Sequence, residues 1–326
     1  SCFYFRVSHL IYNCDFIIAA ETAVMSPIFL PVLIKNFKVC MRPRFMSSNV
    51  PKFETLNVKV DSPHVYSVEL NRPEKYNAMN RVMWKEVGAC FQFLDEESDC
   101  RSIILSGSGR LFSAGLDMSD MGDLISVIQS EMDIARKSKA VKAIITEFQN
   151  SFSMPEKCTK PVIAAIHGAC VGGAVDLICS ADIRYCTQDA WFQVKEVDLG
   201  LAADIGTLQR LPLLVGSESL ARELVFTARK MFSDEAKMSG LVSRVFSDQA
   251  SLQAGVAELA LRIASKSPVA VQGSKQSLIY SRDNGVEAGL LRLADWNMTM
   301  LQSEDLLKAA GAMMSKSSEP PKFESF

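Results

Sequence analysis

The stretch 161-PVIAAIHGACVGGAVDLICSADIRYC-186 decides the fold that we predict for this chain. It begins with an apolar run at 161–168, which has the length of a buried strand, and passes through glycines into a helix expected at about 174–181. Two short strands are expected next, at 182–187 and 190–194. Strands that alternate with helices in this way indicate an α/β protein built in layers.

Regular elements are expected on both sides of this stretch. Upstream, the runs 54–60 and 64–70 alternate apolar and polar residues and predict a β-hairpin. An amphipathic helix at about 79–96, a buried strand at 102–107 and a long helix at about 125–150 follow. Downstream, helices are expected at about 206–215, 217–229, 233–239, 250–266, 268–281 and 285–315, with one strand at 241–246. We therefore expect a catalytic core at 53–266 and a helical C-terminal region at 267–326.

The composition is that of a soluble globular protein. Of 326 residues, 48% are hydrophobic and 22% are charged, and the formal net charge of −2 gives no basic field for nucleic acid. The nine cysteines form no Cys-x-x-Cys pair, which fits reduced thiols in an intracellular compartment. Only three histidines occur, so we predict no metal site and consider a Ser-His-Asp triad unfavoured.

The first 52 residues differ from the rest of the chain. The segment 16–34 is nearly long enough to span a bilayer, but one glutamate and two prolines within it argue against a membrane helix. The segment 35–52 is rich in Lys, Arg and Ser and has no acidic residue, which suits an organelle transit segment. We interpret residues 1–52 as a leader or a disordered segment and expect no stable membrane insertion.

Three acidic residues stand in apolar, glycine-rich surroundings. Glu196 and Asp204 lie eight positions apart in 194-VKEVDLGLAADIGTLQRL-211, and Asp176 lies upstream in the stretch quoted first. Burial disfavours the ionised form of a carboxyl group and raises its pKa. A carboxyl group with a raised pKa can both accept and return a proton near pH 7. The three acids therefore predict a site that transfers protons.

Two glycine-containing turns predict an oxyanion hole. Gly172 and Gly173 join a buried strand to a helix, whose first N–H groups have no acceptor within the helix. The run 112-FSAGLDM-118 also follows a buried strand and offers a second main-chain donor. Two such N–H groups can stabilise a carbonyl oxygen that becomes an enolate.

Three separate motifs together resemble the crotonase (enoyl-CoA hydratase/isomerase) superfamily. They are 70-LNRPEKYNAMN-80, 112-FSAGLDMSDM-121 and the region 161–211, and the resemblance covers roughly residues 53–315. It implies a crotonase-like spiral of ββα units with a helical C-terminal extension. It also implies an acyl-CoA substrate, with coenzyme A as part of the substrate and no separate cofactor.

Within the superfamily, the three acids make the chain most similar to the Δ3,5-Δ2,4-dienoyl-CoA isomerases. Hydratases of the family carry glutamates at the positions of Asp176 and Glu196 and a glycine at Asp204. The simple enoyl-CoA isomerases usually use one glutamate. An isomerase that moves two conjugated double bonds exchanges protons at two distant carbons, C2 and C6. An enoyl-CoA hydratase and a non-catalytic binding protein of the same fold are the alternatives.

The resemblance also implies a role for each residue. Asp204 removes a proton from C2, Glu196 delivers a proton to C6, and Asp176 raises the pKa of Glu196. Leu116 and Gly173 supply the oxyanion-hole N–H groups. The expected substrate and coenzyme A contacts are Lys75, Ala114, Gly115, Leu116, Asp117, Met118 and Gly172, with Arg72 as a further candidate for phosphate.

Assembly and location follow from the same resemblance. It implies a homotrimer or homohexamer in which the helices of 267–326 pack between subunits. It places the protein in the mitochondrial matrix. A peroxisomal pool is the alternative, although the C-terminal 324-ESF-326 is not a Ser-Lys-Leu signal.

Overall fold

The structure is a computed structural model that describes residues 50–120, 122–316 and 319–326. Nearly all of the leader predicted at 1–52 lies outside the described residues. The described strands are β1 (Leu56–Ser62), β2 (Val65–Leu70), β3 (Ser102–Gly107), β4 (Val162–Ile166), β5 (Ala169–Val171), β6 (Ile183–Thr187), β7 (Trp191–Gln193), β8 (Met231–Phe232) and β9 (Arg244–Phe246).

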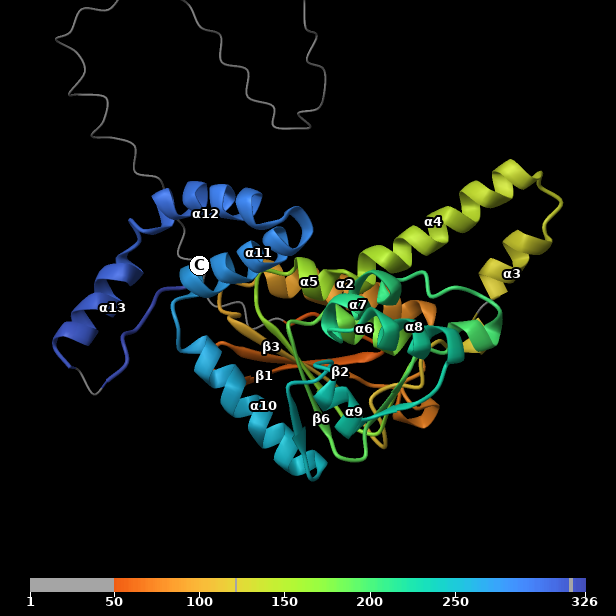
Figure 1. Cartoon of the computed structure of the whole chain (residues 1–326), viewed down its shortest axis with the longest axis horizontal. Coiled ribbons are helices and arrows are strands. Elements are labelled where there is room, and N and C mark those ends of the chain that lie inside the picture. The colour runs from red at the N-terminus through yellow and green to blue at the C-terminus, as the bar shows by residue number, and fades with distance from the viewer. Residues whose placement is uncertain (1–49, 121, 317–318) are drawn as a thin grey trace, which may run out of the picture. The chain divides into compact units, whose positions relative to one another are not determined.

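Helices connect these strands and form the C-terminal region (Figure 1). The α-helices of the described residues are α2 (Arg81–Glu96), α3 (Gly122–Gln129), α4 (Ile134–Phe152), α5 (Met154–Lys157), α6 (Gly173–Cys179), α7 (Thr207–Leu214), α8 (Glu218–Thr227), α9 (Ser233–Met238), α10 (Gln249–Ala264), α11 (Pro268–Asn284), α12 (Val286–Met300) and α13 (Glu304–Met314). The short 3-10 helices are η2 (Pro73–Lys75), η3 (Met118–Asp120) and η4 (Glu196–Leu199).

Within the described residues, the strands form two sheets. The larger sheet has the order β1-β2-β3-β4-β6-β9, and the smaller has the order β5-β7-β8. The predicted hairpin is confirmed, since β1 and β2 pair antiparallel with Leu56 opposite Leu70. From β4 onward the chain alternates between the sheets except at β7 and β8: β4, β6 and β9 join the larger one, and β5, β7 and β8 the smaller. This alternation, with helices between, is the predicted spiral of ββα units, and the predicted fold class is confirmed.

The central strands β3 and β4 of the larger sheet are buried on both faces, which explains their continuous apolar sequence. Successive side chains of a strand point to opposite faces. Ile103 and Leu105 of β3 therefore pack in the main core, whereas Ile104 packs with Val256 and Ala260 of α10. Figure 1 shows α10 along one face of this sheet and α2, α5 and α6 over the other.

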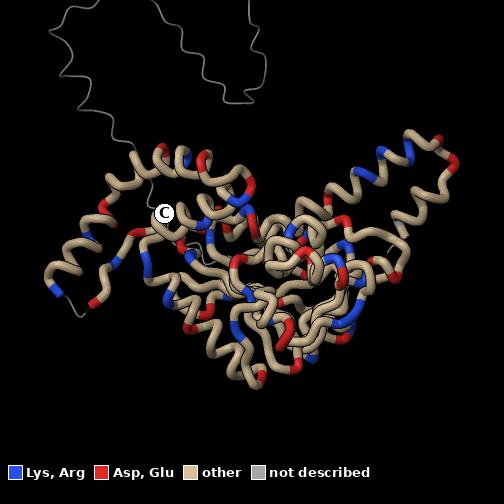
Figure 2. The backbone as a smooth tube through the Cα atoms, in the orientation of Figure 1, with Lys and Arg blue, Asp and Glu red and all other residues tan. Residues whose placement is uncertain are grey.

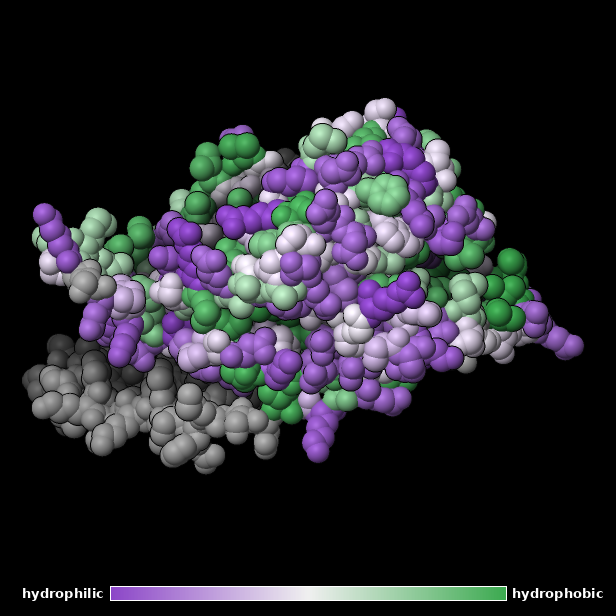
Figure 3. Space-filling view, turned by 90° about the horizontal axis from the view of Figure 1, so that it is seen from below, coloured by the Kyte–Doolittle hydropathy of each residue, from purple (hydrophilic) through white to green (hydrophobic). Residues whose placement is uncertain are grey.

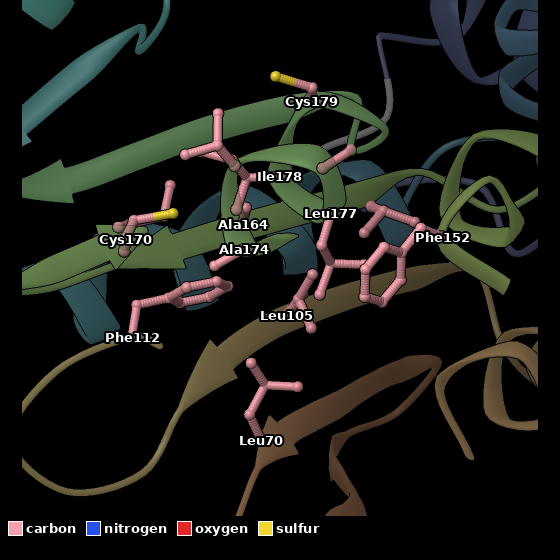
Figure 4. Close-up of a cluster of buried hydrophobic side chains, with 14 of the residues drawn as sticks. Leu70, Leu105, Phe112, Phe152, Ala164, Cys170, Ala174, Leu177, Ile178 and Cys179 are labelled. Carbon is pink, nitrogen blue, oxygen red and sulfur yellow. The ribbon is translucent and has the colours of Figure 1, made fainter. Parts of the chain in front are cut away.

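The main core fixes the position of α6, the helix that carries Asp176. Leu177 of α6 has no exposed surface and packs with Leu105, Phe152 and Ala164, which come from β3, α4 and β4 (Figure 4). All four side chains are 0% exposed. Close packing of this kind leaves a helix little freedom to shift, so the first turn of α6 is held rigidly.

Two predicted helices are in fact pairs of helices. The helix expected at 125–150 is divided into α3 and α4 because Asp133 caps α4: its side chain accepts hydrogen bonds from the N–H groups of Ala135 and Arg136. The helix expected at 285–315 is divided into α12 and α13, with acidic residues in the first turn of α13. Figure 1 shows α3 and α4 as a hairpin that projects from the sheets.

Two strands were missed, and the surface has mixed charge. The sequence did not predict β5 and β8, which have three and two residues and are too short to show a period. Figure 2 shows acidic and basic residues interspersed along the described chain. None of the described helices combines the length and the apolar character that a bilayer crossing requires.

Candidate active site

The structure brings the three predicted acids together on one cavity. Asp176, Glu196 and Asp204 all line a cavity of about 350 Å³. Asp176 lies in the first turn of α6, Glu196 begins η4 directly after β7, and Asp204 lies in the loop before α7. Since β5 and β7 pair in parallel, the segments that follow them leave the same edge of the smaller sheet.

Asp176 is the most deeply buried of the three acids. It is 1% exposed, and its Oδ1 accepts a hydrogen bond of 2.6 Å from the N–H of Thr207, the first residue of α7. Among the described residues, its Oδ2 has no hydrogen-bond partner. Burial, and then the negative charge of Glu196, raises the pKa of Asp176 to about 7. Asp176 can therefore exchange a proton at neutral pH.

Glu196 lies against the glycine turn at the start of α6. A Cβ atom on Gly172 would lie 3.3 Å from Oε1 of Glu196, so the carboxyl group is packed on the backbone there. Gly172 has φ +53° and ψ −125°, a conformation that side chains other than hydrogen rarely permit. Burial raises the pKa of Glu196, and the negative charge of Asp204 adds to this effect. Within the described part of the chain, its buried Oε2 has no partner.

Asp204 is held through its main chain. Its carbonyl oxygen accepts a hydrogen bond of 2.6 Å from Nε2 of Gln149, which belongs to α4. The loop that carries Asp204 is anchored on its other side by Ala203, which is 3% exposed, and then by Thr207. Burial raises the pKa of Asp204. Its side chain thus lines the cavity from the loop before α7.

The two predicted oxyanion-hole donors also lie on this cavity. Leu116 forms a parallel β-bridge with Met79, in which Met79 N donates to Gly115 O and Asp117 N donates to Met79 O. The residues on either side of Leu116 thus make the hydrogen bonds, and the N–H of Leu116 itself points away from Met79. Gly173 begins α6, so its N–H has no acceptor within the helix. Among the described residues, neither N–H has a hydrogen-bond acceptor.

A close approach of two backbones places Leu116 beside α6. Residues 112–113 run parallel to β5: Ser113 N donates to Ala169 O at 3.1 Å, and Val171 N donates to Ser113 O at 3.2 Å. Gly115 has φ +90°, and a Cβ atom there would lie 2.5 Å from the carbonyl oxygen of Val171. Only glycine permits this conformation and this contact.

Most of the remaining cavity wall is apolar and comes largely from the α3–α4 hairpin, and Arg81, Asp120 and Lys195 also line it. The apolar lining residues are Met79, Trp84, Leu124, Val141, Ile144, Ile145, Phe148, Leu199, Leu201 and Ile205. The sequence predicted the helix at 125–150 but did not assign it to the site. Its apolar spacing would have shown a buried face but not which cavity that face lines. This wall can hold a hydrocarbon chain.

The predicted substrate contacts fall into two groups. Ala114, Gly115, Leu116, Met118 and Gly172 line the cavity. Lys75 and Asp117 are not among its lining residues.

The charged candidates in that second group lie elsewhere. Lys75 is exposed in η2, and Oδ2 of Asp117 accepts a hydrogen bond of 2.9 Å from Arg72. Arg72 is therefore engaged by a carboxylate, which argues against it as a free charge for phosphate.

Comparisons with known proteins identify the family of this chain. Residues 61–324 match the model of the family Enoyl-CoA hydratase/isomerase. The mitochondrial Δ(3,5)-Δ(2,4)-dienoyl-CoA isomerase of Rattus norvegicus is 54% identical over 264 residues, which are 81% of this chain and 80% of that protein. The peroxisomal Δ(3,5)-Δ(2,4)-dienoyl-CoA isomerase of Arabidopsis thaliana is 44% identical over 81% of this chain and 95% of that protein.

A solved structure extends the agreement to the fold. The crystal structure of an enoyl-CoA hydratase from Bacillus anthracis superimposes with a TM-score of 0.74 at 28% identity, covering 83% of this chain and 99% of that one. The sheets and the sequence motifs thus lead to the same conclusion. This chain belongs to the enoyl-CoA hydratase/isomerase family.

Proposed function

We propose that this protein is an enzyme that converts 3-trans,5-cis-dienoyl-CoA into 2-trans,4-trans-dienoyl-CoA in the β-oxidation of unsaturated fatty acids. The observation that carries the proposal is one largely apolar cavity on which Asp176, Glu196 and Asp204 lie together with two main-chain N–H donors. The relatives named above as dienoyl-CoA isomerases support the same activity.

The proposed reaction begins with the thioester carbonyl bound by the N–H groups of Leu116 and Gly173. Asp204, as a carboxylate, removes a proton from C2, and the electron pair of that C–H bond passes into the conjugated system to give a dienolate. Removal of one oxyanion-hole donor typically costs about 2.7–4 kcal/mol of transition-state stabilisation. The two donors are main-chain groups on packed elements, so they need no rearrangement when the charge develops.

The reaction ends with protonation of C6. Glu196, as a carboxylic acid, delivers the proton, the C6–H bond forms, and the double bonds settle at C2 and C4 with the carbonyl restored. Asp176 and Glu196 share one proton, because the charge of Glu196 raises the pKa of the buried Asp176 and two such carboxyl groups on one cavity do not both ionise readily. Asp204 then carries the proton taken from C2, and exchange of protons between solvent and the two acids returns the site to its starting state.

The reaction uses carboxyl and main-chain groups alone, and coenzyme A is part of the substrate. An enoyl-CoA hydratase is the second candidate, because Asp176 and Glu196 together can also orient a water molecule. Asp204 favours the isomerase: it provides a further base on the cavity, which hydration does not require.

We also propose an oligomer with a core at 53–266 and a trimerisation region at 267–326. Helices α12 and α13 expose large apolar side chains, among them Leu291 at 68%, Leu307 at 73% and Met314 at 86%. Surfaces of this kind mark protein–protein contacts. Figure 3 shows apolar groups interrupting the hydrophilic surface on one face of the molecule. A homotrimer, or a hexamer of two trimers, would bury the exposed apolar side chains of α12 and α13.

The proposed location is the mitochondrial matrix, with a peroxisomal pool as the alternative. The relatives include proteins named mitochondrial in mammals and one named peroxisomal in Arabidopsis thaliana.

The test is the ultraviolet absorbance of the purified protein with 3,5-octadienoyl-CoA. The isomerase produces a conjugated 2,4-dienoyl thioester, whose absorbance rises with time. Glu196→Gln and Asp204→Asn should each lower kcat by about 10²–10⁴-fold, the usual contribution of general acid–base catalysis. Asp198→Asn is the matched control, since Asp198 lies in η4 but is exposed and paired with Lys195.

Other outcomes would replace the proposal. No rise with the dienoyl thioester, together with hydration of a 2-enoyl-CoA, would make the protein a hydratase. Neither activity, with coenzyme A thioester still bound, would make it a non-catalytic binding protein. Near wild-type turnover in Asp204→Asn would show that Asp204 is not the base at C2.

A further inference from the structure

The hydroxyl group of Ser113 lies in the loop that carries the oxyanion-hole donor Leu116, but the reaction proposed above gives it no role. Ser113 is 0% exposed. Its Oγ donates a hydrogen bond of 2.8 Å to the carbonyl oxygen of Asn77 and accepts one of 3.2 Å from the N–H of Gly115. A carbonyl oxygen only accepts and an N–H only donates, so the direction of both bonds is unambiguous. The hydroxyl therefore ties this loop to a residue 36 positions earlier in the sequence.

Asn77 is a rigid anchor for this hydroxyl. It is 0% exposed, and its Oδ1 accepts a hydrogen bond of 2.9 Å from the N–H of Arg72. Its Nδ2 donates to the carbonyl oxygens of three residues in the loop after β3, at 2.8–3.1 Å: Ser108, Leu111 and Phe112. Any shift of Asn77 would break buried hydrogen bonds, which is costly. The carbonyl oxygen of Asn77 therefore stays in place as the acceptor for Ser113.

Two peptide groups meet at Gly115, and both are held. The N–H of Gly115 belongs to the peptide group before its Cα atom and is bound by Ser113 Oγ. The carbonyl group of Gly115 belongs to the peptide group after it and accepts a hydrogen bond of 2.7 Å from the N–H of Met79. In a trans peptide group the C=O and the N–H point in opposite directions. The direction of the Leu116 N–H is thus set by the orientation of these two peptide groups.

The glycine at position 115 gives the backbone a freedom that the oxyanion-hole donor must not have. The close approach to Val171 O requires a residue without a Cβ atom, and Gly115 has φ +90°. Such a residue populates both signs of φ about equally, so its own sterics do not fix the peptide group that follows. The bond to Ser113 Oγ and the bond from Met79 N–H together restrict φ and ψ of Gly115. Hydrogen bonds thus supply the rigidity that glycine itself lacks.

We propose that Ser113 is a positioning residue: its hydroxyl, anchored on Asn77, holds the N–H of Gly115 and thereby aims the N–H of Leu116 at the thioester carbonyl. This inference rests on the proposed function, since it concerns how the oxyanion hole is kept in place. Donors that are held in advance stabilise a developing oxyanion more than the ground-state carbonyl, because they need no rearrangement when the charge appears. Loss of the hydroxyl therefore weakens binding of the transition state more than binding of the substrate.

The test compares Ser113→Ala, which removes the hydroxyl and both of its hydrogen bonds, with Ser113→Thr, which keeps a hydroxyl. One neutral hydrogen bond changes an equilibrium by roughly fivefold, so two change it by up to about thirtyfold. In Ser113→Ala we expect kcat with 3,5-octadienoyl-CoA to fall by about five- to thirtyfold at an unchanged KM. The assay temperature lies below the unfolding transition of each variant, so that only folded enzyme is compared. Ser113→Thr should recover most of the wild-type kcat.

Ser233→Ala is the matched control. Ser233 is 5% exposed, and its Oγ also donates to a distant carbonyl oxygen, that of Gln188 at 2.7 Å, but it begins α9 and does not line the cavity. Its replacement should lower stability and leave kcat unchanged. A purely structural role of Ser113 would have the same effect: a lower free energy of unfolding and an unchanged kcat of the folded enzyme. That result, or a kcat of Ser113→Thr no higher than that of Ser113→Ala, would overturn the inference.

A second measurement separates this inference from the proposed function, because it needs no turnover. It follows the infrared C=O stretch of 2,4-octadienoyl-CoA, isotope-labelled at the thioester carbonyl and bound to each protein. A hydrogen bond to a carbonyl oxygen lowers this frequency, so the band should lie higher in Ser113→Ala than in the wild type and in Ser233→Ala. If the wild type lacks isomerase activity but the band shifts in this way, the proposed function fails and the positioning role stands. The same band in the wild type and Ser113→Ala would refute the positioning role, whatever the activity.

Discussion

Replacement of Gly115 by alanine should displace the N–H of Leu116 and lower activity, while the rest of the fold stays intact. The new Cβ would lie 2.5 Å from Val171 O, which is 0.9 Å short of the 3.4 Å at which ordinary contact begins. The residue also has φ +90°, and a left-handed conformation costs an L-residue roughly 1–2 kcal/mol. The loop must therefore move away from β5 by nearly 1 Å, and the N–H of Leu116 moves with it.

The loss of activity should exceed the loss of stability. A misplacement of about 1 Å at a reacting group costs around 10²-fold in rate, so kcat for 3,5-octadienoyl-CoA should fall by about that factor. The destabilisation of about 1–2 kcal/mol should lower Tm by only a few degrees in a chain of this size. Both values come from one preparation, by absorbance and by thermal unfolding at a fixed protein concentration.

Gly311→Ala is the control for this substitution. Gly311 lies in α13, and a methyl group added there would have no neighbouring atom within 4 Å, so alanine should leave kcat unchanged and stability equal or slightly higher. If Gly115→Ala retains kcat within threefold of the wild type, the N–H of Leu116 does not bind the thioester carbonyl and the reasoning is refuted.

Three further predictions concern buried charge. Lys275→Met should lower the free energy of unfolding by about 3–5 kcal/mol, because it leaves Asp182, 2.7 Å from Lys275 Nζ, without its buried partner. Glu156→Gln should cost about 2 kcal/mol, since it weakens the charge-assisted hydrogen bonds that Arg210 of α7 donates to Glu156 of α5. Both free energies of unfolding are measured by denaturant unfolding. The free energy of unfolding of Asp176→Asn, taken relative to the wild type, should be higher at pH 8 than at pH 4. The difference between the two pH values should be up to about 4 kcal/mol, which corresponds to about three pKa units.

The sign of the pH effect follows from linkage. The pKa of Asp176 is about 7 in the folded protein, against 3.8 for an ordinary aspartate, so between these values the native state binds more protons than the unfolded state. Stability therefore falls as pH rises through this window, and asparagine, which cannot ionise, escapes the loss. A stability difference that does not change with pH would show that Asp176 is not buried as a titrating group. Wild-type unfolding in Lys275→Met or Glu156→Gln would show that these ion pairs are solvated.

Much of the fold could be predicted because its strands are long apolar runs with glycine turns between them. The strands β3 and β4 are buried on both faces and read as continuous apolar segments. The break between α3 and α4 was not predicted, because it is marked by the cap of Asp133, which begins α4, and not by a change in apolar spacing. β5 has three residues, and its place depends on pairing with β7, which lies about twenty residues further along the chain.

The candidate site shows the same division. The acids could be named from their apolar, glycine-rich surroundings and from the resemblance to the family. Their common cavity depends on the two sheets, which no local pattern specifies. Thr207 and Gln149 carried no signal at all, since a threonine after glycine and a glutamine in a helix are ordinary. Their roles come from hydrogen bonds between a side chain and the main chain, across 31 and 55 residues of sequence.

The parallel pairing of residues 112–113 with β5 has a consequence for how the enzyme could acquire new substrates. In the proposed mechanism, the carbonyl at the reacting end is bound by backbone N–H groups, which every residue except proline supplies. Side chains at 116 and 118 can therefore be exchanged freely to reshape the cavity while activation of the thioester is retained. A library randomised at these two positions should yield variants with new chain-length preferences, and proline at 116 should be selected against at every chain length.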